Sequence, residues 1–354
     1  MSQDESTTVT NEDLSPAPVG GVLCAGYGSR LAPLTDVLPK PLMPFLNTPM
    51  VAYALNHLVG AGVEQVGINL HHLPDAIPPV VDRLCANFGL RPRYVREWEI
   101  LGTAGGVRGI WQGLGEPETT LIVLNGDSIM NIDLAARLQA HRQSGALASM
   151  VVRPRASDQP GRVWLNEAQE LRGLRDARHP DAASESLREY DFTGVHFLEP
   201  ELLRRIPLEE GCMVGDVYIP MLERGERINA LINDDFWAAL DNPRLFFETT
   251  RRVLREPGLF AQAPLPEALG ESLYIYNQDT IDDKAQLAGP LLAGLHASVD
   301  SGARVGPEVV LDGVEITGGA RISQSILYGM GRVEGDWERV MAVAGKVVSF
   351  SLDD

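Results

Sequence analysis

Four residues near the amino terminus have the chemistry needed to bind a chain of phosphates. Gly26 and Gly28 follow an apolar strand start, and without a Cβ they permit a tight turn that brings backbone N–H groups against phosphate oxygens. Arg30 adds a planar, permanently charged fork, and Lys40, which stands between two prolines, adds a compact cation on a stiffened loop. Because two cations and several amides converge on one anion, this segment predicts a phosphate-binding loop.

The spacing of these residues excludes the two best-known phosphate loops. A dinucleotide-binding loop has the pattern G-x-G-x-x-G, and its third glycine is missing here. A P-loop has the pattern G-x-x-x-x-G-K-[ST], whereas Lys40 follows Gly26 by fourteen residues and lies between Pro39 and Pro41. Neither pattern therefore accounts for this loop.

What remains resembles the signature of the sugar-1-phosphate nucleotidyltransferases, also called NDP-sugar pyrophosphorylases. That signature is G-x-G-[ST]-R-L-x-P-L-T followed by P-K-P, and residues 26–41 read GYGSRLAPLTDVLPKP. The resemblance continues through LGTAGG at 101–106, NGDS at 125–128 and FTGVHFLEPELL at 192–203. The resemblance covers roughly residues 19–250. Within the family, the chain is most similar to the branch of mannose-1-phosphate guanylyltransferases and bacterial NDP-sugar synthases.

The resemblance implies one displacement reaction, in which the phosphate of a sugar 1-phosphate attacks the α-phosphorus of a nucleoside triphosphate and pyrophosphate leaves. Arg30 and Lys40 would be the catalytic cations, and Asp127 would hold Mg²⁺ as the cofactor. The branch favours GTP with a mannose- or heptose-type sugar slightly over UTP or dTTP with glucose-type substrates. The partners are thus a nucleoside triphosphate and a sugar 1-phosphate.

The family pattern also implies which residues surround the substrates. The nucleotide would contact Leu23, Ala25, Gly26, Gly28, Ser29, Glu97, Gly102 and Thr103, and the sugar would contact Gly161, Thr193 and Gly194. Glu97 and Glu99 could accept hydrogen bonds from the amino and imino groups of guanine, but exposed glutamates are common, so this pair does not decide the base.

One position departs from the family pattern. The late motif W-x-D-[VIL]-G-[TD]-P carries the second metal-binding aspartate, whereas residues 237–243 read WAALDNP and place Ala239 there. Metal affinity should therefore fall, unless Asp241 turns toward the site or the phosphates of the nucleotide carry the ion. A second hypothesis follows, in which the chain is a catalytically impaired homologue that binds nucleotide sugars and acts as a regulatory or scaffold subunit.

Apolar runs that alternate with amphipathic stretches predict how these residues are positioned. This β-α-β-α rhythm is typical of a Rossmann-like, doubly wound and mostly parallel α/β sheet, and the resemblance implies the nucleotidyltransferase A fold. Ligands of such sheets lie beyond the carboxyl ends of the strands, so Gly26 and Asp127 should face one crevice. A helix is predicted to have Thr48 as its N-cap and Pro49 as its first residue.

The pattern changes near residue 286, where helical periodicity stops and small residues recur between single aliphatic ones. Repeats at six-residue spacing are typical of hexapeptide β-helices, and we predict a small left-handed parallel β-helix; the alternative is the glycine-rich edge of a β-sandwich. The residues that carry the spacing are Val299, Val305, Leu311, Ile316 and Ile322.

We therefore expect four segments and a chain that could form homo-oligomers through its last one. They are a disordered leader at 1–18, a nucleotidyltransferase domain at 19–255, a linker at 256–285 and the β-helix at 286–354.

Composition limits the classes of partner. The net charge of −18 would repel nucleic acid. No apolar run approaches the ~18 residues needed to cross a membrane, and the acidic amino terminus does not resemble a secretory signal. Three widely separated cysteines do not suggest a disulfide framework. We expect a cytoplasmic protein.

Overall fold

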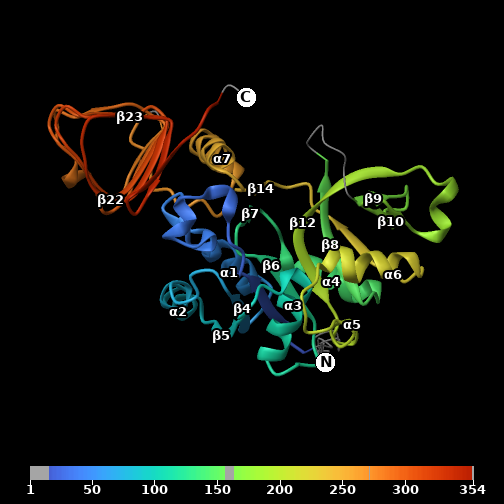
Figure 1. Ribbon diagram of the computed structural model, residues 1–354. Helices are drawn as coiled ribbons and strands as arrows, with labels where there is room; N and C mark the ends of the chain where they lie inside the picture. Colours follow the sequence, from blue (N-terminus) through green and yellow to red (C-terminus); the bar gives the residue numbers. More distant parts are fainter. Residues whose placement is uncertain (1–15, 156–162, 271, 353–354) are drawn as a thin grey trace, which may run out of the picture.

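The computed structural model describes residues 16–155, 163–270 and 272–352. Within them, ten strands form the main sheet, in the order β11-β10-β9-β12-β6-β1-β4-β5, with β8 joined to β12 and β13 joined to β8 (Figure 1). The strands span Val19–Leu23 (β1), Gln65–Leu70 (β4), Arg91–Arg96 (β5), Leu121–Asn125 (β6), Ala148–Pro154 (β8), Val163–Leu165 (β9), Leu171–Leu174 (β10), Ala177–Arg178 (β11), Arg188–Leu198 (β12) and Asn229–Ile232 (β13).

The centre of this sheet is parallel and contains the point where the strand order reverses. From β1 the chain builds outward to β4 and β5, and then returns to place β6 on the other side of β1. Leu23 at the end of β1 pairs with Asn125 at the end of β6 and with Asn69 near the end of β4. Three strand ends therefore meet where ligands of open parallel sheets bind.

Helices cover both faces of the sheet because successive strand residues point to opposite sides. Ile122 and Leu124 of β6 pack with helices α1 (Met50–Gly60), α2 (Ile77–Phe88) and α4 (Leu134–Ser144). Leu121 and Val123 pack on the other side with α3 (Gly102–Gly113), α5 (Pro200–Leu203) and α6 (Ile219–Glu223). The mixed α/β fold with a parallel sheet is confirmed. None of the helices among the described residues is long and apolar enough to span a bilayer.

The predicted start of the first helix is wrong by one residue. Thr48 and Pro49 form a short strand, β3, that pairs with β2 (Pro44–Phe45), so α1 begins at Met50. Pro49 is the N-cap, with extended backbone at φ −54° and ψ 131°, and no side chain caps the helix. The pairing of Thr48 with Phe45 holds the chain extended, which overrides the capping preference of threonine.

A second, two-stranded sheet lies next to the carboxyl end of β6. Strand β7 (Ser128–Met130) pairs in antiparallel fashion with β14 (Trp237–Ala239), and Ala239 stands directly opposite Ser128. The segment after β14 is thereby brought beside Asp127, although more than a hundred residues separate the two in sequence.

The carboxyl-terminal part consists of short strands that pair in parallel with later ones, apart from the antiparallel last strand, β25. All five residues that carry the six-residue spacing are buried in one cluster there. The strands are β15 (Leu273–Ile275), β16 (Gln286–Leu287), β17 (Leu291–Ala293), β18 (Ala297–Val299), β19 (Arg304–Val305), β20 (Val309–Ile316), β21 (Arg321–Ser323), β22 (Ser325–Val333), β23 (Asp336–Glu338), β24 (Val340–Val343) and β25 (Lys346–Ser349).

Helix α7 (Pro243–Arg255) lies between this part and the main sheet (Figure 1). Its Phe246 and Phe247 belong to an apolar core that also contains residues of the carboxyl-terminal strands, among them Leu292 and Met341. Arg255 of α7 forms an ion pair with the buried Glu308. The two parts are therefore joined by a common core.

We predict that His196 makes the unfolding free energy fall in acid. The ring is 3% exposed on β12, its Nδ1 lies 2.7 Å from the Tyr218 hydroxyl, and burial lowers its pKa from 6.5 to about 3. Because the folded pKa lies below the unfolded one, the stabilisation is complete above about pH 6.5 and declines as the pH falls toward 3. Between pH 7 and pH 5 the loss should be about 2 kcal/mol.

Urea unfolding at both pH values measures this loss. His196→Gln, which does not titrate, should show a shallower pH dependence than wild type, and His296→Gln, at an exposed histidine, should match wild type. Equal pH dependence of wild type and His196→Gln would contradict the assignment.

Candidate functional site

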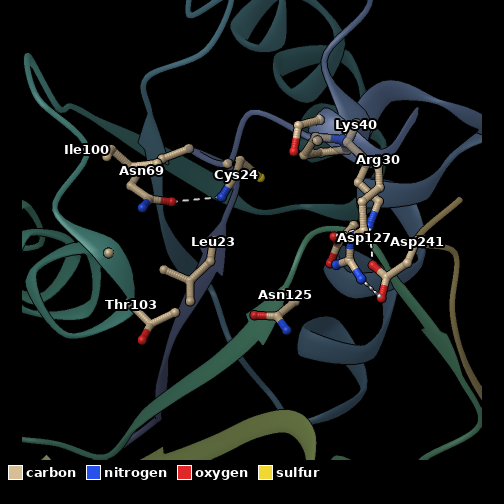
Figure 2. Close-up of a pocket in the computed structure, with 16 residues that line it drawn as sticks. Leu23, Cys24, Arg30, Lys40, Asn69, Ile100, Thr103, Asn125, Asp127 and Asp241 are labelled. Atoms are coloured by element: carbon tan, nitrogen blue, oxygen red, sulfur yellow. Dashed lines mark hydrogen bonds and ion pairs between the residues drawn. The ribbon is translucent and has the colours of Figure 1, made fainter. Parts of the chain in front are cut away.

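A crevice lies beyond the carboxyl ends of β1 and β6, at the point where the strand order reverses. Figure 2 shows its charged side chains gathered on one side, with Ile100 and Thr103 on the other. Gly26 and Asp127 both line it, as expected from the meeting strand ends. The lining comprises Leu23, Cys24, Ala25, Gly26, Gly28, Ser29, Arg30, Lys40, Pro41, Asn69, Ile100, Gly102, Thr103, Asn125, Asp127 and Asp241.

The two glycines of the loop serve different needs. Gly28 has a left-handed φ of 64°, and a Cβ there would lie 2.9 Å from Cγ2 of Thr35 and 3.0 Å from Cβ of Lys40. Its conformation and its close packing both require glycine. A Cβ on Gly26 would meet no atom within 4 Å, so the space beside Gly26 is free for a ligand.

Four charged side chains form one cluster at the edge of the crevice. The ammonium of Lys40 lies 2.7 Å from Oδ2 of Asp127 and 2.8 Å from Oδ1 of Asp241 (Figure 2). The other carboxylate oxygen of Asp241 lies 3.0 Å from the guanidinium of Arg30. The Lys40 side chain is only 8% exposed, whereas that of Arg30 is 70% exposed. Lys40 is therefore a buried cation that depends on its two carboxylates, whereas the ion pair of Arg30 with Asp241 is open to solvent.

Asp241 supplies a second carboxylate although the family position holds Ala239. Strand β14 ends at Ala239, Leu240 is fully buried in the apolar core, and Asp241 then lines the crevice. The acidic side chain arrives two residues later than in the family motif. Asp241 and Asp127 thus contact the same Lys40 ammonium.

The chemistry of this cluster fits a magnesium ion. Asp127 and Asp241 offer carboxylate oxygens, the ligands that Mg²⁺ prefers, and the Lys40 ammonium already lies between them as a cation. In the described part of the chain, no group of three or more His, Cys, Asp or Glu side chains could hold a metal by itself. Phosphate oxygens of a nucleotide would complete the coordination, as is usual for Mg²⁺.

Cys24 lines the crevice but does not offer a nucleophile. Burial, together with the nearby charge of Asp127, raises the pKa of its thiol well above the ordinary value. The side chain therefore stays a neutral thiol at physiological pH.

Glu97 is buried, 5% exposed, and each of its carboxylate oxygens accepts a hydrogen bond. Oε1 accepts a hydrogen bond from Nδ2 of Asn69 at 2.7 Å, and Oε2 accepts one from the backbone N–H of Leu101 at 2.9 Å. Asn69 in turn accepts a hydrogen bond from the N–H of Cys24 at 2.7 Å. Through these bonds Glu97 fixes the end of β1 to the start of α3. Contact of Glu97 with the base of a nucleotide stays a prediction.

Gly102 and Thr103 form the first turn of α3 and contact the segment around Gly211. Gly102 has φ 63°, and a Cβ there would lie 2.4 Å from the carbonyl oxygen of Gly211. The Thr103 hydroxyl accepts a hydrogen bond from the N–H of Met213 at 2.8 Å. The amino terminus of α3 is thereby held at the crevice wall.

Of the residues expected around the sugar, Thr193 and Gly194 do not themselves line the crevice. Thr193 is buried, and its hydroxyl donates to the carbonyl of Val151 at 2.8 Å. Gly194 has φ 85°, and a Cβ there would lie 2.4 Å from Nδ2 of Asn125. Gly194 therefore leaves room for Asn125, which does line the crevice. Gly161 lies outside the described residues.

Sequence reasoning did not assign Asn69 or Asn125 to the crevice. Asn125 was within reach of the sequence, because it opens the NGDS segment that was matched for Asp127. Asn69 lies next to the last residue of β4 and belongs to none of the motifs described above.

The chain is similar to known proteins over most of its length. The model of the nucleotidyl transferase family matches residues 19–256. A UTP–glucose-1-phosphate uridylyltransferase of Synechocystis is 25% identical, over 87% of this chain and 86% of its own length. A probable mannose-1-phosphate guanylyltransferase of Arabidopsis thaliana is 29% identical, over 92% and 91%. A mannose-1-phosphate guanylyltransferase of Mycobacterium tuberculosis is 28% identical, over 86% and 82%.

We predict that Glu97→Gln destabilises the fold. A glutamine offers one acceptor oxygen, so its amide group would face the donor of Asn69 or of Leu101 and leave a buried donor unpaired. The cost should be about 1–3 kcal/mol of unfolding free energy. Urea unfolding measures it, with Glu99→Gln at an exposed neighbouring glutamate as the control. Unchanged stability of Glu97→Gln together with lost nucleotide binding would show that Glu97 contacts the base instead.

Proposed function

Since this chain belongs to the nucleotidyl transferase family, as its motifs predicted, we propose that it joins a sugar 1-phosphate to a nucleoside triphosphate. The products are an NDP-sugar and pyrophosphate. The observation that supports this proposal best is the cluster of Arg30, Lys40, Asp127 and Asp241 at the carboxyl ends of β1 and β6. It brings two cations and two carboxylates to the place where a triphosphate would lie.

In this proposal the protein positions two phosphates and stabilises their charge. The backbone beside Gly26 and Gly28 binds the triphosphate, and Arg30 stabilises the charge that develops on the leaving pyrophosphate. Lys40 donates to the oxygens of the reacting phosphates. Bound Mg²⁺ supplies further neutralisation of phosphate charge. Displacement needs no covalent intermediate with the protein, and correct placement of the attacking oxygen provides a large part of the rate.

GTP with a mannose-type sugar 1-phosphate is the substrate pair that we favour. Two of the three relatives described above are named as mannose-1-phosphate guanylyltransferases and the third as a uridylyltransferase. The residues on the nucleotide side of the crevice are Leu23, Ala25, Gly26, Gly28, Ser29, Gly102 and Thr103. Glu97 supports this side through its hydrogen bonds to Asn69 and the Leu101 N–H, and we keep it among the residues proposed to contact the nucleotide.

The impaired, regulatory homologue is the weaker hypothesis. It was motivated in part by Ala239, at the position where the family motif carries an aspartate, and Asp241 places a carboxylate on the Lys40 ammonium that Asp127 also contacts. No feature of the described residues favours it.

We further propose that the part from residue 286 onward is a left-handed β-helix and a site of self-association. The parallel pairing of successive strands supports the β-helix, since the sheets of a β-sandwich are built from antiparallel strands. The catalytic domain would then span 19–255 and the linker 256–285. A cytoplasmic location fits the free cysteines Cys24, Cys85 and Cys212.

The proposal predicts pyrophosphate release that depends on Lys40. Wild type should release pyrophosphate from at least one of GTP, UTP, dTTP, ATP and CTP with a sugar 1-phosphate and Mg²⁺. Lys40→Gln should lower kcat by about 10²–10³-fold, the usual cost of one charge-stabilising donor. Lys284→Gln, at an exposed lysine of the carboxyl-terminal part, serves as the control. Failure of every triphosphate with a panel of sugar 1-phosphates would refute the proposed function.

A further inference from the structure

Asp241 contacts both of the cations that would bind a triphosphate. One carboxylate oxygen lies 2.8 Å from the Lys40 ammonium and the other lies 3.0 Å from the Arg30 guanidinium. A triphosphate in the crevice would need the same two cations. The carboxylate and the incoming phosphates therefore compete.

We infer that Asp241 exchanges partners when substrate binds: it holds Arg30 and Lys40 in the free protein, and joins Asp127 as a ligand of Mg²⁺ once phosphates have taken those cations. This inference rests on the proposed function. It assigns to this chain a metal ligand outside the position where the family motif carries one.

The two contacts of Asp241 differ in how easily they break. Arg30 is 70% exposed, and ion pairs in such surroundings contribute little to stability. Lys40 is buried and needs an anionic partner at all times. A phosphate oxygen can be that partner, so the arrival of the triphosphate releases Asp241 without leaving Lys40 unpaired.

A released Asp241 then faces phosphate charge. Its carboxylate and that of Asp127 would repel the triphosphate in the absence of a cation, and would both bind a divalent ion in its presence. Metal and triphosphate should therefore each raise the affinity for the other, because such coupling is reciprocal.

The backbone on either side of Asp241 is fixed, so the exchange needs only a rotation of the side chain. Leu240 is fully buried in the apolar core. Asn242 is the N-cap of α7, and its side chain accepts a hydrogen bond from the N–H of Leu245 at 2.9 Å.

Triphosphate affinity of Asp241→Asn, measured with and without metal, tests the inference. The probes are GTP and, independently of the base, inorganic triphosphate, titrated calorimetrically in EDTA and then in Mg²⁺. In EDTA the variant should bind several-fold more tightly than wild type, because a competitor for Arg30 and Lys40 is gone. In Mg²⁺ it should bind about tenfold more weakly. Asp235→Asn, at an exposed residue before β14, should match wild type in both.

Direct metal binding gives a second readout. Mn²⁺ binding, followed by electron paramagnetic resonance, should be strengthened by inorganic triphosphate in wild type and hardly at all in Asp241→Asn. The double variant Ala239→Asp/Asp241→Asn, which returns the carboxylate to β14 opposite Ser128, should recover the strengthening.

The direction in which Asp241→Asn changes triphosphate affinity in each buffer decides whether the inference holds. A variant that binds more weakly in both buffers has lost only a structural ion pair, and one that binds more tightly in both has lost only a competitor. Either result, or no change, overturns the inference. Wild type that binds triphosphate with these properties but releases no pyrophosphate would overturn the proposed function alone. Absence of triphosphate binding by wild type would overturn both.

Discussion

The crevice depends on one ammonium group held between two carboxylates. Lys40 is almost fully buried, and Asp127 and Asp241 are the groups that make its charge tolerable there. They come from distant parts of the chain, one from the end of the central sheet and the other from the segment before α7. A buried cation with two anionic partners is costly to separate, so this contact fixes the phosphate loop relative to the sheet and relative to α7.

The rest of the architecture brings these three side chains together. Parallel β1 and β6 place the phosphate loop and Asp127 at neighbouring strand ends. The pairing of β14 with β7 brings Asp241 to the same place. Glu97 connects β1 to α3 from below through Asn69. The crevice thus has one side where charged groups meet through strand pairing and another where hydrogen bonds join the end of β1 to the start of α3.

The sequence predicted those parts of the site that depend on local order. Gly26, Gly28, Arg30 and Lys40 stand within fifteen residues, so their spacing identifies the family, and the strand before Asp127 predicts its place at a sheet end. The position of Asp241 depends on the register of β14 against Ser128 and on the burial of Leu240, which no local pattern reveals.

Contacts between distant parts of the chain could not be predicted from local sequence. The place of Glu97 before LGTAGG did not reveal that it is buried and accepts hydrogen bonds from Asn69 and the Leu101 N–H; its contact with the nucleotide stays a prediction. Thr48 has the side chain of an N-cap, yet its pairing with Phe45 decided the backbone. The domain division at residues 255 and 286 followed from the change in periodicity and from the family resemblance, and it stays a prediction.

The core around α7 bears on how this protein folds. Leu240, which precedes Asp241, belongs to the same apolar cluster as Phe246 of α7 and Leu292 and Met341 of the carboxyl-terminal strands. The side chain of Asn47, which follows the phosphate loop, also donates to the carbonyl of Leu311 at 3.2 Å. A cut of the chain at the end of α7 would therefore expose this shared apolar core, so the part before the cut would need the carboxyl-terminal strands for its full stability.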